Sequence, residues 1–179
     1  MNDPGPVAGL VLRPWRDDDA AALITAVGDP LLHRWTRVRA ADAAEAQQWL
    51  GVQHAGRRTG SRYSFAVLDD AGKLVGNVAL KRPDPAAEDA EVGYWTAAYA
   101  RGRGIAPQAL GSLTRWAFGT FPGLLRLQLL HQVDNTASCR VAVKSGYPYE
   151  RTLAACDPYP LEGHVHVRDR QAGEPELAR

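Results

Sequence analysis

The chain of 179 residues carries a formal net charge of +1 at pH 7, and 45% of its residues are hydrophobic. This length suits one domain with a sizeable core, and the composition excludes a largely disordered chain. The near-neutral charge argues against a general nucleic-acid or membrane-surface binder. Two cysteines are too few for a disulfide framework, and no segment is long and apolar enough to cross a bilayer. With no leader-like N-terminus, a soluble cytoplasmic protein is expected.

The first third of the chain predicts one strand followed by two helices. An apolar run at residues 10–15 is typical of a strand, and a helix over residues 20–27 follows three acidic residues. Residues 31–36 are expected to form an aromatic and basic connection. Asp42 is placed to cap a second helix, which reaches residues 49–52 and ends in the region of Gly56 to Gly60. We expect these two helices to form a wall over one end of a sheet.

Three strands are predicted next, at residues 63–68, 74–80 and 90–96. The first two are joined by residues 69–72, whose sequence Asp-Asp-Ala-Gly is typical of a hairpin turn. The connection that follows the second strand is also short and polar. Because neither connection is long enough for a crossover, the three strands are expected to be antiparallel neighbours.

The last third of the chain predicts a strand, a helix and a final hairpin. Residues 124–130 are rich in leucine and follow a helix, so this strand should lie parallel to the strand at 90–96. Asn135 is placed to cap the next helix, although capping is also what a simple structural role would require. Residues 147–155 and 163–168 are typical of a closing antiparallel pair.

A glycine- and arginine-rich turn, residues 101–106, leads from a predicted strand into the third helix. Gly102 and Gly104 lack Cβ atoms, so the backbone can approach a ligand closely. The first amides of a helix have no partners within it, and the helix dipole favours negative charge there. With the guanidinium groups of Arg101 and Arg103, the turn is suited to a phosphate or pyrophosphate. The other interpretation is a tight connection with solvent-exposed arginines.

This turn matches neither GxxxxGK[ST] nor GxGxxG, which argues against the common nucleotide-binding loops. The helix that it opens tolerates Pro107, because the missing N–H of a first-turn proline has no partner in any case. The helix is amphipathic, and its spacing predicts an apolar face made of Ile105, Ala109, Leu110, Leu113, Trp116 and Ala117.

Three segments of the chain carry a family resemblance: residues 90–95 (AEVGYW), 101–106 (RGRGIA) and 135–147 (NTASCRVAVKSGY). They resemble the GNAT N-acetyltransferase superfamily, and within it the RimJ/RimL-like branch. The second segment is similar to the R/Q-x-x-G-x-G/A pyrophosphate signature, and the third to the N-x-x-S…K-x-G-F/Y segment. Weaker similarity runs from about Leu10 to about Thr152, so the resemblance covers most of the chain.

The resemblance implies an α+β, three-layer fold. Its sheet is mixed and mostly antiparallel, with about seven strands, a splayed parallel pair and about four flanking helices. Residues 1–179 are then a single acyltransferase domain, with residues 1–8 and 171–179 expected to be frayed tails. Acetyl-CoA, or another acyl-CoA, is implied as co-substrate. The residues expected to bind it are Tyr94, Trp95, Thr96, Arg101, Gly102, Arg103, Gly104, Ile105, Ala106, Asn135 and Ser138.

Acyl transfer to an amine requires a base, an acid and donors for the oxyanion. Glu91 is the first candidate base, with an ordinary strand salt bridge as the alternative, and His131 is the second candidate. Many members of the resembled family carry a tyrosine acid seven residues after Asn135, where this chain has Ala142. The RimJ/RimL pattern has a serine instead, which makes Ser138 the candidate acid.

No metal is expected. His164 and His166 lie on one face of a predicted strand, but the sequence shows no third ligand nearby, so they are interpreted as surface or substrate-wall histidines. Cys139 is expected to be a small buried helix residue rather than a nucleophile, because no neighbouring base is evident. The two histidines make the last predicted strand differ from that of the resembled family, in which Arg-Asp is usually followed by an apolar stretch.

The acceptor cleft is expected to be lined by His33, Trp35 and Tyr159, although Trp35 is equally suited to packing helices on the sheet. The predicted function is an acyl-CoA-dependent N-acyltransferase that moves acetyl to a primary amine by direct attack in a ternary complex. The expected acceptor is a protein N-terminal α-amine or a small-molecule amine. No nucleic-acid or membrane partner is expected, and the sequence leaves open whether the protein is a homodimer. The alternatives are a non-catalytic acyl-CoA sensor, an antibiotic-modifying acetyltransferase and a nucleotide-dependent transferase.

Overall fold

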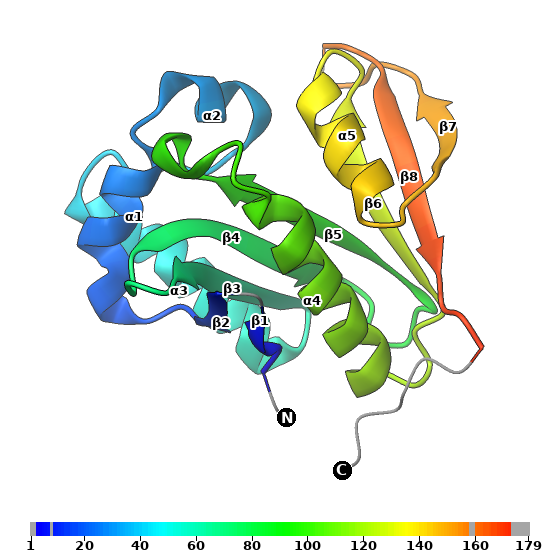
Figure 1. Cartoon of the computed structure of the whole chain (residues 1–179), viewed down its shortest axis with the longest axis horizontal. Helices are drawn as coiled ribbons and strands as arrows, with labels where there is room; N and C mark the ends of the chain where they lie inside the picture. The colour runs from blue at the N-terminus through cyan, green and yellow to red at the C-terminus, as the bar shows by residue number, and fades with distance from the viewer. Residues whose placement is uncertain (1–2, 8, 158–159, 173–179) are drawn as a thin grey trace.

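The computed structural model describes residues 3–7, 9–157 and 160–172, and it contains one eight-stranded sheet with helices on both faces (Figure 1). The strands are β1 (Gly5–Val7), β2 (Leu10–Pro14), β3 (Arg62–Asp69), β4 (Leu74–Lys81), β5 (Asp89–Thr96), β6 (Arg126–Gln132), β7 (Tyr149–Leu153) and β8 (Gly163–Asp169). The α-helices are α1 (Ala20–Val27), α2 (Pro30–Trp35), α3 (Ala43–Thr59), α4 (Ile105–Thr120) and α5 (Thr136–Lys144). Within the described ranges, none of these helices could cross a membrane.

The strand order is β1-β2-β3-β4-β5-β6-β8-β7, and only β5 and β6 pair in parallel. The mixed, mostly antiparallel sheet with one parallel pair confirms the predicted fold class. The last two strands are antiparallel, as predicted, but β8 lies between β6 and β7. The chain therefore ends its sheet by inserting β8 beside β6, which places the histidines of β8 against the end of the parallel pair.

Two segments differ from the sequence-based expectation. Gly5–Val7, expected to be part of a frayed tail, forms β1 and pairs antiparallel with β2; positive φ at Gly9 allows the tight turn between them. Residues 31–36, expected to be a connection, lie mostly in α2. That helix begins at Pro30, and the side chain of Asp29 accepts a hydrogen bond from the Leu31 amide. Six residues are too few to show a helical period, so sequence patterning missed this helix.

Two hydrophobic clusters lie on opposite faces of the sheet. On one face, α4 packs its predicted apolar stripe, and all six stripe residues are buried against strand residues such as Phe65 and Leu80. On the other face, α1 and α3 cover a second cluster that includes Trp15 and Trp95. Alternation along β5 divides its side chains between these faces, with Val92 in the first cluster and Trp95 in the second.

The parallel pair is joined over only part of its length. Residues Asp89–Val92 of β5 pair with Arg126–Leu129 of β6, whereas β5 continues to Thr96 and β6 to Gln132. Beyond this short ladder the strands diverge, with α4 beside β5 and α5 beside β6 (Figure 1). The splayed parallel pair is thereby confirmed. Past Val92, the backbone of β5 has no strand partner on its β6 side.

Candidate active site

The glycine turn presents unpaired amides at the start of α4. Gly102 and Gly104 have φ values of 77° and 74°, the left-handed region that glycine adopts without strain. Gly104 is the residue before the first turn of the helix, where its Cα carries no side chain that would cover the amides. Among the described residues, no carbonyl or side chain accepts a hydrogen bond from the N–H groups of residues 102–106. The turn therefore has the donors and the dipole that an anion requires.

The two arginines of the turn already have carboxylate partners. Arg101 forms an ion pair with Asp29, and Arg103 lies 3.8 Å from Asp69. Burial acts to raise the pKa of Asp29, but the hydrogen bonds from Arg101 and from the Leu31 amide outweigh it and lower that pKa. Sequence reasoning missed these partners, because nothing local links Asp29 to the turn. The arginine side chains are still 37% and 52% exposed, so they remain within reach of a ligand.

The open edge of β5 supplies a second set of backbone groups. The amide of Ala97 donates to the carbonyl of Val75 at 3.0 Å, and alternation then directs the backbone of Trp95 toward β4 as well. The backbone groups of Tyr94 and Thr96 therefore face the gap between β5 and β6. The Trp95 side chain is buried on the face of the sheet that α1 and α3 cover, and its ring centroid lies 6.2 Å from that of Trp15. Its indole N–H has no hydrogen-bond partner among the described residues.

Ser138 and Tyr94 meet between α5 and β5. The Tyr94 hydroxyl donates to Ser138 Oγ at 2.9 Å, and Asn135 Oδ1 accepts from the Ser138 amide at 3.1 Å. Asn135 therefore caps α5, as its position predicts. Burial raises the pKa of Tyr94, and the hydrogen bond to Ser138 opposes this shift. The pairing of Tyr94 with Ser138 was not anticipated, although alternation along β5 places Tyr94 on the α5 side.

The two candidate bases lie on opposite faces of the sheet. Glu91 alternates with Val92, faces the α1 and α3 side, and forms an ion pair with Lys81; its side chain is 38% exposed. His131 lies on the α5 side, where its Nδ1 is 2.8 Å from the Gln132 carbonyl. Burial lowers the pKa of His131, and that hydrogen bond opposes the shift. The structure thus brings Ser138 and His131 to one face and leaves Glu91 on the other.

Two of the three residues expected to line the acceptor cleft lie on α2. His33 is exposed on α2, and Trp35 is half-buried, with the Arg34 guanidinium 4.6 Å from its ring centroid. Tyr159 lies outside the described residues. Arg34 also forms an ion pair with Asp134, just before α5, at 2.7 Å. Because α2 is also linked to the glycine turn through Asp29, this helix is connected to both sides of the gap between β5 and β6.

A shallow, charged hollow of about 430 Å³ lies at the other end of the parallel pair, lined by Glu88, Asp89, Leu125, Arg126, Gln128, Arg151 and Asp169. These residues surround the start of the ladder between β5 and β6, whereas the glycine turn follows the far end of β5. The hollow is therefore distinct from the gap between the diverging strands. Its lining of opposed charges is occupied by ion pairs such as that between Arg126 and Asp169.

Comparison with known proteins identifies the family. The family model for the acetyltransferase (GNAT) domain matches residues 9–148, which is most of the chain. The chain belongs to the GNAT acetyltransferase family. The match includes β5, the glycine turn and α5, so the GNAT domain contains the gap and the unpaired amides described above. No curated protein sequence matches this GNAT acetyltransferase.

Solved structures share the GNAT fold over nearly the whole chain. RimJ from Mycobacterium smegmatis, solved in complex with CoA-disulfide, is 26% identical, with a TM-score of 0.78 over 89% of this chain and 81% of that one. RimL, a ribosomal L7/L12 α-N-protein acetyltransferase in complex with coenzyme A, is 17% identical, with a TM-score of 0.81 over 92% and 97%. The microcin C7 self-immunity acetyltransferase MccE, in complex with acetyl-CoA and AMP, is 17% identical, with a TM-score of 0.80 over 90% and 93%.

Proposed function

We propose that this protein is an acyl-CoA-dependent N-acyltransferase that transfers acetyl from acetyl-CoA to a primary amine. The observation that carries the proposal is the row of unpartnered amides at residues 102–106, placed where β5 diverges from β6. A diphosphate fits these donors, because the two glycines leave no Cβ over them. The likeness to RimJ and RimL in their coenzyme A complexes supports the same cofactor.

The open edge of β5 accounts for the rest of the cofactor. Pantetheine carries two amide groups, and the backbone of Tyr94 and Thr96 can pair with them as it would with an added strand. At the diphosphate end, Arg101 and Arg103 exchange their carboxylate partners for phosphate oxygens, which arginine also binds in bidentate geometry. Asn135 lies on the other side of the gap. Its amide donates to the Gln132 carbonyl, its carbonyl accepts from the Cys139 amide and its Oδ1 caps α5, so its side-chain amide nitrogen is the group proposed to reach the cofactor.

The proposed chemistry is a single displacement. Acetyl-CoA supplies an activated thioester when bound. Glu91 accepts a proton from the attacking amine through water, and a β5 amide that faces the gap donates to the oxyanion. As the C–N bond forms and the C–S bond breaks, the Ser138 hydroxyl donates a hydrogen bond to the departing thiolate, which then takes a proton from solvent. Tyr94 donates to Ser138 Oγ, which orients the serine hydroxyl and strengthens it as a donor.

Ser138→Ala is expected to lower kcat by about tenfold to a hundredfold with little change in the Kd for acetyl-CoA, because it removes a hydrogen bond to the charged leaving group. Steady-state kinetics with separately measured cofactor affinity check this result. Tyr94→Phe keeps the ring and removes the hydroxyl behind Ser138, so a smaller loss of kcat is expected. Wild-type kcat in Ser138→Ala would remove serine from the proposed mechanism.

The proposed acceptor class is supported by comparison with other acetyltransferases. RimL is named for α-N-acetylation of a ribosomal protein and MccE for self-immunity to microcin C7, so acetyltransferases with different roles share this fold. We favour a protein N-terminal α-amine, which the chain's RimJ/RimL-like segments support. His33 and Trp35 on α2 are the described residues proposed to line this side.

Release of free thiol from acetyl-CoA across a panel of amines tests the proposed function. The panel contains peptides with free N-termini, the same peptides with blocked N-termini, polyamines and aminoglycosides. Turnover confined to free N-termini supports the favoured acceptor, and turnover on a small amine supports the antibiotic-modifying alternative. Micromolar binding of CoA without turnover on any amine would favour a non-catalytic sensor. Stabilisation by ATP rather than by CoA would instead indicate a nucleotide-dependent transferase.

A further inference from the structure

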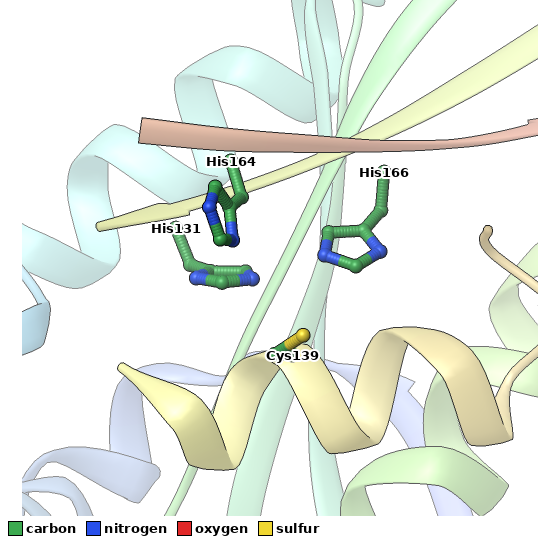
Figure 2. A group of neighbouring side chains, drawn as sticks. All are labelled: His131, Cys139, His164 and His166. Carbon is green, nitrogen blue, oxygen red and sulfur yellow. The ribbon is translucent and has the colours of Figure 1, made fainter. Parts of the chain in front are cut away.

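Four potential metal ligands converge on the α5 side of the sheet. They are His131 at the end of β6, Cys139 on α5, and His164 and His166 on β8 (Figure 2). One ligand atom from each residue lies within 4.8 Å of the ligand atoms of the other three. We propose that these residues, the His/Cys cluster, bind one Zn²⁺ ion.

The fold explains why these residues meet. In the antiparallel ladder between β6 and β8, His131 is paired with His164, and Leu129 with His166. Alternation places all these side chains on the same face of the sheet as the buried Leu129. Cys139 precedes Ala142, the buried residue of α5, by three positions, so the two share the inner face of the helix. A sequence reading of β8 alone finds only two of the four residues.

The hydrogen bonding of the rings directs lone pairs into the cluster. Nδ1 of His131 lies 2.8 Å from the Gln132 carbonyl, and Nδ1 of His166 lies 3.0 Å from the Tyr147 carbonyl. Since a carbonyl only accepts, each Nδ1 carries the proton and each Nε2 presents its lone pair. Backbone carbonyls fix metal-binding imidazoles in the same way in known zinc sites.

Three ring nitrogens in the cluster are buried without a hydrogen-bond partner among the described residues: Nε2 of His131, Nδ1 of His164 and Nε2 of His166. Buried polar atoms are almost always paired, so three unpaired nitrogens at one place require an explanation. His166 is fully buried and His131 is 9% exposed, which leaves little room for bulk water to satisfy them. The stacking of His131 on His166, with centroids 5.1 Å apart, involves the ring faces and leaves the in-plane lone pairs unused.

The donor set selects the metal. Three imidazole nitrogens and one thiolate favour zinc or another borderline first-row ion, and the absence of a carboxylate among the four disfavours Mg²⁺ and Ca²⁺. Around tetrahedral Zn²⁺ the ligand atoms lie roughly 3.3–3.7 Å apart. Side-chain rotations that move the ligand atoms by about 1 Å therefore bring the four residues to zinc-binding distances. Four protein ligands leave no open position, which is typical of a structural site.

A structural ion is needed most in this part of the molecule. Of the residues of α5, only Ala142 is buried, and all five residues of β7 are exposed. Few apolar contacts therefore hold α5 to β6 and β8. An ion bound by ligands from all three elements would fix the helix, and with it Ser138, which precedes the ligand Cys139. This inference does not depend on the proposed acetyl transfer.

Metal titration of the chelator-treated full chain tests the proposal. We expect one equivalent of Zn²⁺ to bind and to raise the melting temperature, and Co²⁺ to give tetrahedral visible bands together with a thiolate charge-transfer band. Cys139→Ser should abolish the charge-transfer band and weaken Zn²⁺ binding at least ~100-fold, the upper end of the range typical for changes in the groups that hydrogen-bond to metal ligands. Cys156→Ser removes the other cysteine, which is exposed, and is the matched control.

The variants change Cys139 and His164, because these two ligands are only half-buried and their substitution should leave the protein folded. Substitution of the fully buried His166 can unfold the protein and is avoided. His164→Gln should weaken Zn²⁺ binding as strongly as Cys139→Ser, while both variants keep the far-UV circular dichroism of the wild type. Absence of stoichiometric Zn²⁺ binding by the wild type would overturn the proposal. Equal Zn²⁺ affinity in the wild type and either variant would do the same.

Discussion

Gly104→Glu is expected to weaken CoA binding at least ~100-fold, equivalent to about 2.7 kcal/mol. Gly104 immediately precedes α4, and the amides of residues 102–106 surround the position proposed for the diphosphate. A carboxylate there would repel the phosphates and occupy the space that they need. Isothermal titration of CoA into the folded variant checks the expectation, and CoA affinity equal to that of the wild type would refute the placement of the site.

Two controls separate charge from backbone strain at this position. Gly104 has φ of 74°, and a Cβ there would lie 3.4 Å from Nε2 of Gln108. Any side chain at this φ costs about 1–2 kcal/mol of folding free energy. Gly104→Ala carries that strain without bulk, and Gly104→Gln adds bulk without charge. We expect Gly104→Ala to weaken CoA binding least, Gly104→Gln more and Gly104→Glu most. The melting temperature should fall by a similar amount in all three variants.

Glu91→Gln is expected to lower kcat/KM by about 10²–10⁴-fold, the usual contribution of a general base. The substitution keeps the shape of the side chain but removes its ability to accept a proton. Steady-state measurement of kcat/KM for the variant and the wild type checks this loss.

The ion pair of Glu91 with Lys81 provides the control. Lys81→Met breaks the pair but leaves the carboxylate, so activity should fall far less than in Glu91→Gln. Both side chains of the pair are more than a third exposed, and exposed pairs contribute little to stability. Equal losses of activity in the two variants would mean that the ion pair, rather than proton transfer, accounts for the effect of substituting Glu91, and Glu91 would then be withdrawn as the base.

Local signals in the sequence were sufficient for most of the fold. Helix caps, hairpin residues and the apolar stripe of α4 are short-range features, and the structure has them where the sequence predicts them. The parallel pairing of β5 and β6 also followed from local evidence, because a helix between two strands forces a crossover. The glycine turn was predicted for the same reason, since its conformation and its free amides depend on adjacent residues.

Contacts between distant segments were not predicted. Arg101 and Asp29 are 72 residues apart, and Tyr94 and Ser138 are 44 apart. The His/Cys cluster depends on the register between β6 and β8 and on the rotation of α5, neither of which leaves a trace in local composition. Such pairings are set by the packed fold as a whole, so sequence reasoning identified the residue types without their partners.

The ion pair of Arg101 with Asp29 has a consequence for how the two substrates affect each other's binding. Asp29 caps α2, the helix that carries His33 and Trp35. Any phosphate that draws Arg101 away from Asp29 changes what anchors that helix, so occupancy at the glycine turn alters the wall proposed for the amine. Thermodynamic linkage then requires the amine to influence cofactor affinity by the same factor. Such coupling would make the two binding events interdependent.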